Sequence, residues 1–196
     1  EKLFEKSKFA NQKGLKSSLV KYLSMIRNID SNVGDLANFL DTKGVIDDTI
    51  IIFLTDNGST MGKSYFNAGM RGMKTELWEG GHRVPLFIKW KNGNFKEVGN
   101  EVEGLCRVTD IVPTLVELCG LKISNRSSLK GMSLAPILKG KKEISKERKL
   151  IINYSRMPNF ISYPIPHGQT ILKKEGAVVL WKNWRRLESR ELYNLE

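Results

Sequence analysis

The sequence predicts an α/β protein in which helices flank a sheet, followed by a small antiparallel β segment. An amphipathic helical pattern over residues 16–41 leads, after a short polar connection, into the apolar, β-branched run 49–55. Helix, short loop and buried strand are the element order of an α/β layer fold. After Glu143 the pattern changes to short strand-sized runs, which are typical of a small antiparallel sheet.

The helix is predicted from apolar residues that recur at helical spacing. Gly44 lies just beyond this pattern and suits a left-handed C-terminal cap. The run 49–55 is apolar at nearly every position, so we expect a strand that is buried on both faces, as in a parallel sheet covered by helices. The apolar helix positions are Leu19, Leu23, Ile26, Val33, Leu36 and Leu40.

Further elements follow in order along the chain. Residues 86–90 form a second strand candidate, and Thr109 or Asp110 can cap a helix that runs to about Cys119 and closes at Gly120. We place a boundary near residue 124, which separates a part at 1–123 from a part at 124–196. The later elements are a short helix at 133–138 and strands at 150–154, 177–181 and 184–187.

Composition narrows the class of partner. The 196 residues carry a net charge of +11, which attracts polyanions such as sulfated glycans, nucleic acid or anionic lipid. Basic residues are not interleaved with aromatic ones in the manner of nucleic-acid binders, so we expect no nucleic-acid partner. No apolar run approaches about 18 residues, so we expect no membrane span. Cys106 and Cys119 match no zinc spacing, and we expect two free, buried thiols.

The residues Asp56-Asn57-Gly58 directly follow the first predicted strand. Binding sites in α/β sheets lie beyond the carboxyl ends of strands. A carboxylate beside an amide carbonyl offers two hard oxygen donors, the type of ligand that Ca²⁺ and Mg²⁺ prefer. Asp-Asn-Gly is also a common turn, and these three residues alone leave both interpretations open.

The wider segment 49–85, TIIIFLTDNGSTMGKSYFNAGMRGMKTELWEGGHRVP, resembles the sulfatase family of the alkaline phosphatase-like superfamily. The family places an apolar strand before Asp-Asn-Gly, then an Asn near Arg-Gly-x-Lys, then Glu-Gly-Gly-x-Arg-x-Pro. Here the later motifs are Asn67, Arg71-Gly72-Met73-Lys74 and Glu79-Gly80-Gly81-His82-Arg83-Val84-Pro85. Further matches are Asp110-Ile111-Val112-Pro113-Thr114-Leu115, Gly131-Met132-Ser133-Leu134 and Glu191-Leu192-Tyr193-Asn194-Leu195.

The resemblance covers nearly the whole chain and implies the C-terminal part of an alkaline phosphatase-like sandwich, a mixed sheet flanked by helices, with a small antiparallel β appendage. Residues 1–123 would be the C-terminal portion of the catalytic α/β domain. Residues 124–196 would be a C-terminal subdomain that carries the small sheet.

The resemblance also implies site residues. Asp56 and Asn57 would be metal ligands, most often to Ca²⁺ in this family, with Mg²⁺ as the other choice. Lys74 would reach the sulfate or its bridging oxygen and stabilise charge that develops there. His167, in a Pro-rich loop, is a candidate substrate contact. The remaining polar motif residues, Arg71, Glu79, His82 and Arg83, are interpreted as scaffold or packing.

The family nucleophile is a formylglycine made from the Cys of a Cys-x-Pro-x-Arg sequence, and neither Cys106 nor Cys119 is followed by that pattern. We therefore expect an N-terminal half outside this chain to supply it, and this chain alone to be inactive. The implied enzyme hydrolyses sulfate monoesters, of aryl or carbohydrate type, to an alcohol and inorganic sulfate. Family members that degrade sulfated glycans are usually periplasmic, secreted or lysosomal, and we expect the same here.

Two alternatives stay open. Superfamily relatives hydrolyse phosphate or phosphonate esters at related metal sites, and a Thr or Ser nucleophile would favour that reaction. A non-enzymatic, basic glycan-binding module is the other alternative, supported by charge alone, and it would bind with a steep salt dependence.

Overall fold

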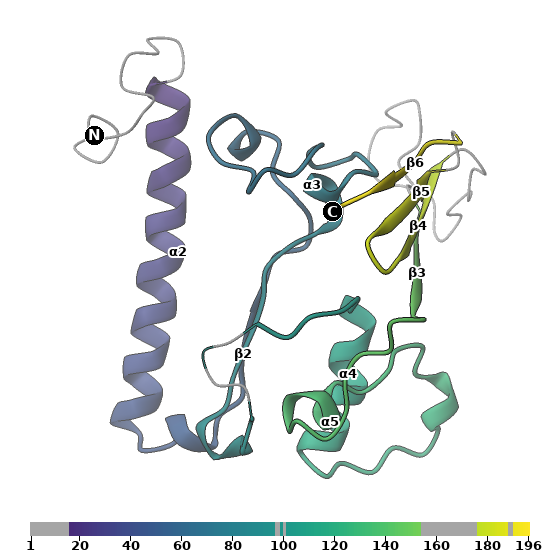
Figure 1. The fold of residues 1–196 in the computed structure, drawn as a ribbon. Helices are drawn as coiled ribbons and strands as arrows, with labels where there is room; N and C mark the ends of the chain where they lie inside the picture. The colour runs from purple at the N-terminus through teal and green to yellow at the C-terminus, as the bar shows by residue number, and fades with distance from the viewer. Residues whose placement is uncertain (1–15, 97–98, 100, 154–175, 188–189) are drawn as a thin grey trace, which may run out of the picture. The chain divides into compact units, whose positions relative to one another are not determined.

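The computed structural model describes residues 16–96, 99, 101–153, 176–187 and 190–196. The chain divides into two compact units, Glu1–Lys89 and Trp90–Glu196, and each is described by itself (Figure 1). The boundary near residue 124 concerns the domain layout of the whole protein and stays a prediction. His167 lies outside the described residues.

The first unit contains the predicted helix and both predicted strands. Its long helix ends at Thr42, one residue beyond the predicted limit, and Gly44 beyond it has a φ of +68°, as a left-handed cap requires. Near its start, Leu19 packs against Tyr65, which fixes the helix to the loop after the first strand. The elements are α2 (Lys16–Thr42), β1 (Ile51–Leu54), α3 (Glu79–His82) and β2 (Leu86–Lys89).

The expectation of a strand buried on both faces in a parallel sheet is wrong for this chain. β1 pairs with β2 in antiparallel register, with Phe53 opposite Phe87. Phe53 and Leu54 are successive residues, so their side chains point to opposite faces of the pair. They are 36% and 37% exposed, so neither face is covered. The physical reason is that β1 has a single neighbouring strand among the described residues, and two strands enclose neither face.

The second unit joins a short helical segment to a four-stranded antiparallel sheet of order β3-β4-β5-β6. This confirms the predicted appendage and adds a fourth strand at its edge. Val178 and Leu180 on β4 are buried, as strand alternation against a covered face requires. The elements are α4 (Ile111–Leu118), α5 (Ala135–Leu138), β3 (Lys149–Asn153), β4 (Ala177–Trp181), β5 (Trp184–Leu187) and β6 (Leu192–Asn194).

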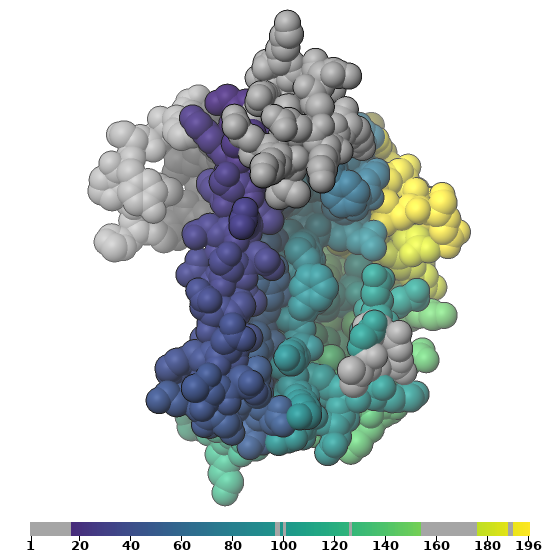
Figure 2. Space-filling view, turned by 90° about the vertical axis from the view of Figure 1, so that its left-hand side faces the viewer, coloured from purple at the N-terminus to yellow at the C-terminus, as the bar shows by residue number. Residues whose placement is uncertain are grey.

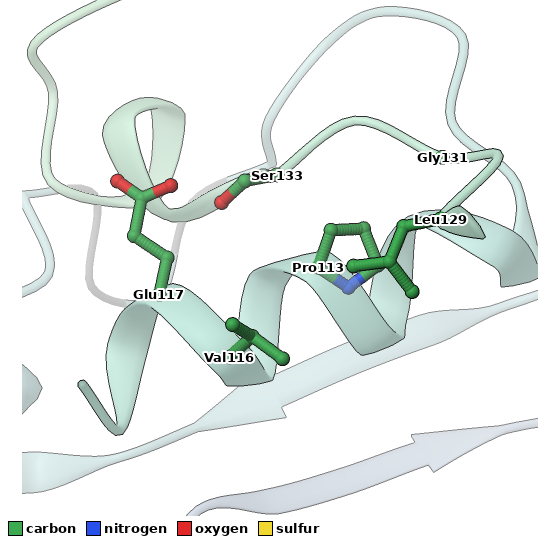
Figure 3. Close-up of a pocket in the computed structure, with 6 residues that line it drawn as sticks. All are labelled: Pro113, Val116, Glu117, Leu129, Gly131 and Ser133. Atoms are coloured by element: carbon green, nitrogen blue, oxygen red, sulfur yellow. The ribbon is translucent and has the colours of Figure 1, made fainter. Parts of the chain in front are cut away.

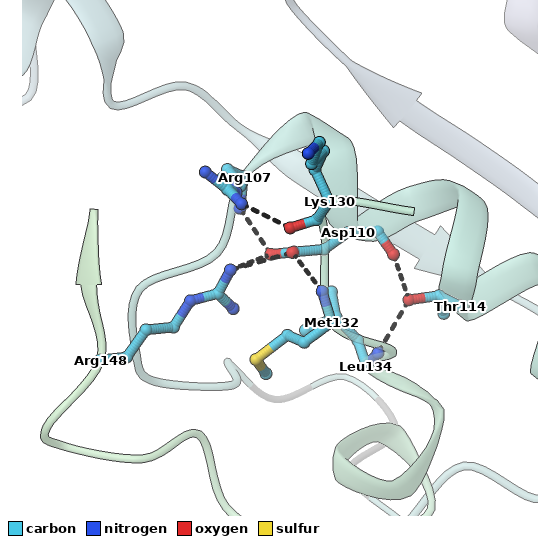
Figure 4. Close-up of polar contacts among 7 residues, drawn as sticks. All are labelled: Arg107, Asp110, Thr114, Lys130, Met132, Leu134 and Arg148. Carbon is cyan, nitrogen blue, oxygen red and sulfur yellow. Dashed lines mark hydrogen bonds and ion pairs between the residues drawn. The ribbon is translucent and has the colours of Figure 1, made fainter. Parts of the chain in front are cut away.

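The fully buried Asp110 holds the second unit together at the start of α4 (Figure 4). Its Oδ2 accepts a hydrogen bond from the backbone N of Arg107 at 2.9 Å, and its Oδ1 accepts one from the backbone N of Met132 at 2.9 Å. Arg148 Nη2 donates to both oxygens, at 2.9 and 2.8 Å. A single carboxylate therefore joins three chain segments.

Thr114 extends this network by one turn of α4. Its Oγ1 donates to the carbonyl of Asp110 at 2.6 Å and accepts from the backbone N of Leu134 at 2.8 Å. The two polar residues of the Asp-x-x-Pro-Thr-Leu motif thus bind the Gly-x-Ser-Leu motif, which explains both sequence matches as scaffold.

Both cysteines are free, as predicted, but the expectation that they are buried is wrong, because Cys106 and Cys119 are both exposed. Cys119 is the C-cap residue of α4. Protein atoms around the Cys106 thiol desolvate it, and together with the nearby Asp110 carboxylate they raise the pKa of this thiol. Among the described helices, none has the length and apolar character to cross a bilayer.

Candidate functional site

The three motifs of the first unit meet in one loop cluster beyond β1. The backbone N of Gly58 donates to the carbonyl of Gly81 at 3.0 Å, which joins Asp-Asn-Gly to Glu-Gly-Gly. The backbone N of Gly80 donates to the carbonyl of Arg71 at 2.8 Å, which joins the third motif to the second. Main-chain hydrogen bonds therefore hold the three motifs together, although Gly58 and Gly81 are 23 residues apart in the sequence.

Asn67 shapes the loop between the first two motifs. Its Nδ2 donates to the carbonyls of Met70 at 2.5 Å and Gly72 at 3.0 Å, so one amide closes the turn that leads into Arg71. Its role in this chain is to position the loop, since both interactions are with the loop's own backbone.

Two glycines make the close packing possible. Gly72 has a φ of +88°, and a side chain there would also collide with the Cβ of Trp78. A side chain at Gly80 would collide with the carbonyl of Gly72 and the amide of Asn67. Gly72 is therefore required by its backbone angle and its contact with Trp78, and Gly80 by the close approach of the second and third motifs.

Asp56 and Asn57 directly precede Gly58, which belongs to this cluster. Asp56 is exposed, and its Oδ1 accepts a hydrogen bond from the backbone N of Asn57 at 2.9 Å; the side chain of Asn57 is partly exposed. These side chains offer two oxygen donors to a hard cation, which normally takes six to eight. The described residues contain no group of three or more His, Cys, Asp or Glu that could hold a metal. The oxygens of Asp56 and Asn57 are of the type that Ca²⁺ takes, but two donors are too few to complete such a site.

Lys74 is exposed in the turn before α3. Within the described part of the chain, its ammonium makes no ion pair or hydrogen bond, so it is available to an anion. The next residue, Thr75, has a φ of +77°, an unusual conformation for a β-branched side chain. Such strain collects at functional sites, because the surrounding structure must hold it in place.

The other polar residues of the motifs are engaged within the fold, as the scaffold interpretation expects. The guanidinium of Arg71 stacks on Trp78, 3.2 Å from the ring centroid. Glu79 is 4% exposed and lies 3.7 Å from His82 Nε2, which also hydrogen-bonds the carbonyl of Leu77 at 3.1 Å. Arg83 is exposed, as Arg71 is, but its guanidinium makes no hydrogen bond, ion pair or stacking contact within the described residues.

Sequence reasoning missed Thr75 and Trp78. Both lie between the second and third motifs, and their roles depend on a backbone angle and a stacking contact that no residue pattern encodes.

A small cavity of about 220 Å³ lies in the second unit (Figure 3). Its lining contains none of the predicted site residues, since it is formed by Pro113, Val116, Glu117, Leu129, Gly131 and Ser133.

A family model for sulfatases matches residues 2–121, which is more than half of the chain. The chain belongs to the sulfatase family. Human steryl-sulfatase is 29% identical over 160 residues, which is 78% of this chain but 26% of that protein. The chain thus spans about a quarter of the length of this relative.

Solved structures agree with the family on the fold. The crystal structure of Ps i-CgsB in complex with a neocarrahexaose matches with a TM-score of 0.71 at 23% identity, over 89% of this chain and 36% of that one. The phosphonate monoester hydrolase of Agrobacterium radiobacter matches with a TM-score of 0.59 at 24% identity, over 89% and 34%. The alkaline phosphatase-like fold predicted from the motifs is therefore confirmed.

Proposed function

We propose that this sulfatase chain is part of an enzyme that hydrolyses sulfate monoesters, of aryl or carbohydrate type, to an alcohol and inorganic sulfate. The observation that carries the proposal is the loop cluster beyond β1. It fixes the scaffold residues of three motifs by hydrogen bonds and stacking, and it leaves Asp56, Asn57 and Lys74 open to solvent and ligands.

In this proposal, Asp56 and Asn57 contribute two oxygens to a Ca²⁺ or Mg²⁺ ion. When bound, such a cation neutralises the charge on the sulfate oxygens and activates the nucleophile. Lys74 places its ammonium against the sulfate or its bridging oxygen, where charge grows as the ester bond breaks. The nucleophile is a formylglycine from outside these 196 residues, because Cys106 and Cys119 lack the required neighbours.

The proposal predicts that the 196-residue chain alone shows no sulfatase activity. A chimaera gives a positive test: the segment of Ps i-CgsB that matches residues 49–85 is replaced by this chain's own segment. We expect the chimaera to release sulfate from the neocarrahexaose with which Ps i-CgsB was crystallised. Lys74→Ala in the chimaera should lower kcat by about 10²-fold or more, as loss of one charge-stabilising donor does.

Lys63→Ala is the matched control, because Lys63 is an exposed lysine of the same loop region. Asp56→Ala and Asn57→Ala should raise the Ca²⁺ concentration needed for half-maximal rate. Equal rates for the Lys74→Ala and Lys63→Ala chimaeras would refute the role of Lys74, and an unchanged Ca²⁺ requirement would refute the metal site.

A second reaction has support from the fold. The phosphonate monoester hydrolase shares it, and that likeness concerns the fold alone. The family model and the steryl-sulfatase favour sulfate. The nucleophile outside these 196 residues discriminates between the two reactions, because a Thr or Ser in place of the formylglycine would favour phosphonate hydrolysis instead.

A further inference from the structure

One face of the β3-β4-β5-β6 sheet is open, and its side chains form a row that crosses all four strands. The opposite face holds the buried Val178, as strand alternation requires. On the open face, Lys149 lies opposite Trp181, Trp181 opposite Trp184, and Trp184 opposite Asn194. Trp181 is partly buried and the other three residues are exposed. We refer to these four residues as the tryptophan row.

Two lysines lie against Trp181. Lys149 Nζ is 5.3 Å from the centroid of the Trp181 ring, and Lys182 Nζ, from the turn between β4 and β5, is 4.7 Å from it. The electron-rich ring attracts both ammonium groups and keeps them beside the row. Lys182 also pairs with Glu147 at 2.9 Å, but the two side chains are 42% and 69% exposed. An ion pair in solvent is weak, so an anionic ligand can replace Glu147.

The next strand adds an open aromatic ring and a third cation. Trp184 is 42% exposed, and Arg186, two residues further along β5, is exposed on the same face. The indole of Trp184 and the guanidinium of Arg186 make no hydrogen bond, ion pair or ring contact within the described residues. The face therefore presents one free indole ring among three cationic side chains.

The charge of the second unit favours a polyanionic ligand. Residues 90–196 hold 19 Lys and Arg against 11 Asp and Glu, which is a net charge of +8 out of the +11 of the whole chain. The end of this unit, yellow in the space-filling view, lies at the surface (Figure 2). A basic surface raises the local concentration of anionic ligands, and a flat sheet face suits an extended one.

We propose that the tryptophan row, together with Lys182 and Arg186, binds a sulfated glycan. The C–H groups of one sugar ring pack on the electron-rich face of Trp184, and sulfate groups on neighbouring sugars accept hydrogen bonds from the three cationic side chains. Neighbouring strands lie about 4.8 Å apart, so the row is about 14 Å long and holds several sugar rings. This surface lies in the second unit, whereas the residues proposed for hydrolysis lie in the first.

Nucleic acid is also a polyanion, but the row fits it less well. Single-stranded nucleic acid binds by stacking successive bases on several aromatic side chains. Here two ammonium groups lie over the ring of Trp181, so Trp184 is the ring of the row that is open to stacking. One stacking contact among several cations matches a glycan that carries many sulfates. The proposal concerns binding alone, so it can fail while the proposed function holds.

The test measures binding of the full 196-residue chain to immobilised dextran sulfate by biolayer interferometry, with unsulfated dextran and a single-stranded DNA oligonucleotide for comparison. We expect binding to dextran sulfate and none to dextran. Trp184→Ala should weaken binding at least tenfold, although it leaves the charge unchanged, because the stacking surface is lost. Arg186→Ala should weaken binding at least threefold, because a sulfate loses its partner.

Phe39→Ala and Lys43→Ala are the matched controls. Phe39 is 57% exposed on α2, and Lys43 Nζ lies 5.6 Å from the centroid of its ring, so the same pairing of lysine and aromatic ring occurs there without a sheet. Both controls should leave binding within twofold. Circular dichroism checks that each variant keeps its fold.

Four results would overturn the proposal. Equal effects of Trp184→Ala and Phe39→Ala would show that binding depends on net charge alone. Binding that Lys74→Ala abolishes and Trp184→Ala leaves unchanged would place the glycan at the residues proposed for hydrolysis. Tighter binding to the oligonucleotide than to dextran sulfate would assign the row to nucleic acid. A doubled mass in light scattering that Trp184→Ala abolishes would assign it to a second copy of this chain.

Discussion

Replacing Asp110 by asparagine keeps the shape of the side chain and removes its charge. In the folded chain, Oδ1 and Oδ2 each accept a backbone hydrogen bond, from Met132 and Arg107, and each also accepts from Arg148. An asparagine amide must turn its NH₂ toward one of these backbone N–H groups, whichever way it is oriented. The substitution therefore leaves a donor facing a donor and a guanidinium facing a neutral group.

The magnitude follows from the burial of both partners. Asp110 is fully buried, and the side chain of Arg148 is 12% exposed, so little solvent screens the pair. Removing one partner of a buried pair costs about 3–5 kcal/mol, and an unsatisfied buried donor costs about 1–3 kcal/mol. Since small domains are stable by about 5–15 kcal/mol, we expect Asp110→Asn to lose about 3–5 kcal/mol, a large share of the total.

Urea denaturation, followed by circular dichroism and tryptophan fluorescence, measures the loss. Thr114→Val gives a milder step, because it leaves the backbone N of Leu134 without its acceptor, and we expect about 1–3 kcal/mol. Glu147→Gln is the matched acidic control: its partner Lys182 lies at the surface, and we expect no measurable change. A loss below about 1 kcal/mol for Asp110→Asn would refute this account of the network.

Two further predictions concern local structure. Gly80→Ala should destabilise the first unit by about 1–3 kcal/mol in urea denaturation, because the new methyl group would meet the carbonyl of Gly72. Gly34→Ala is the control: it lies in open space on α2 and should stabilise the first unit by about 1 kcal/mol. Equal effects of the two changes would contradict the packing argument. In a Cys119→Ser background, Cys106 is the one thiol left to react with iodoacetamide. The pH midpoint of its alkylation rate should lie above the ordinary thiol value of about 8.5, because the raised pKa of Cys106 favours the unreactive protonated thiol. A midpoint at or below that ordinary value would contradict the raised pKa.

The sequence predicted best those elements whose apolar residues recur at a regular spacing or form a strand-sized run. The helical spacing from Leu19 to Leu40 places α2 to within one residue of its observed end, and strand-sized runs locate β3, β4 and β5. The same reasoning overstated the burial of β1. An apolar run shows that a strand could be buried on both faces. The segments that would cover those faces lie elsewhere in the sequence, and the run itself does not identify them.

Burial of polar residues was harder to predict, because it depends on partners rather than on pattern. Arg185 on β5 is 4% exposed, and its Nη1 donates to the carbonyls of Lys182 and Trp184, both at 2.9 Å. Arg185 lies on the same side of the strand as the buried Leu187, and Trp184, 42% exposed, lies on the same side as Arg186. Each side therefore has one apolar residue and one arginine, so hydrophobicity alone does not say which side is buried. The carbonyls of this turn help to satisfy the buried guanidinium of Arg185.

Hydrogen bonding separates two classes of polar motif residue. Asp110 and Asn67 direct their polar atoms to the chain itself, so the fold accounts for the residue type at each position. The ammonium of Lys74 and the amide of Asn57 make no such interaction within the described residues, and Lys74 is followed by a strained Thr75. No interaction of Lys74 within the described residues accounts for the strained turn that follows it. The proposed function supplies a reason for this turn, because there Lys74 is held for a sulfate ligand.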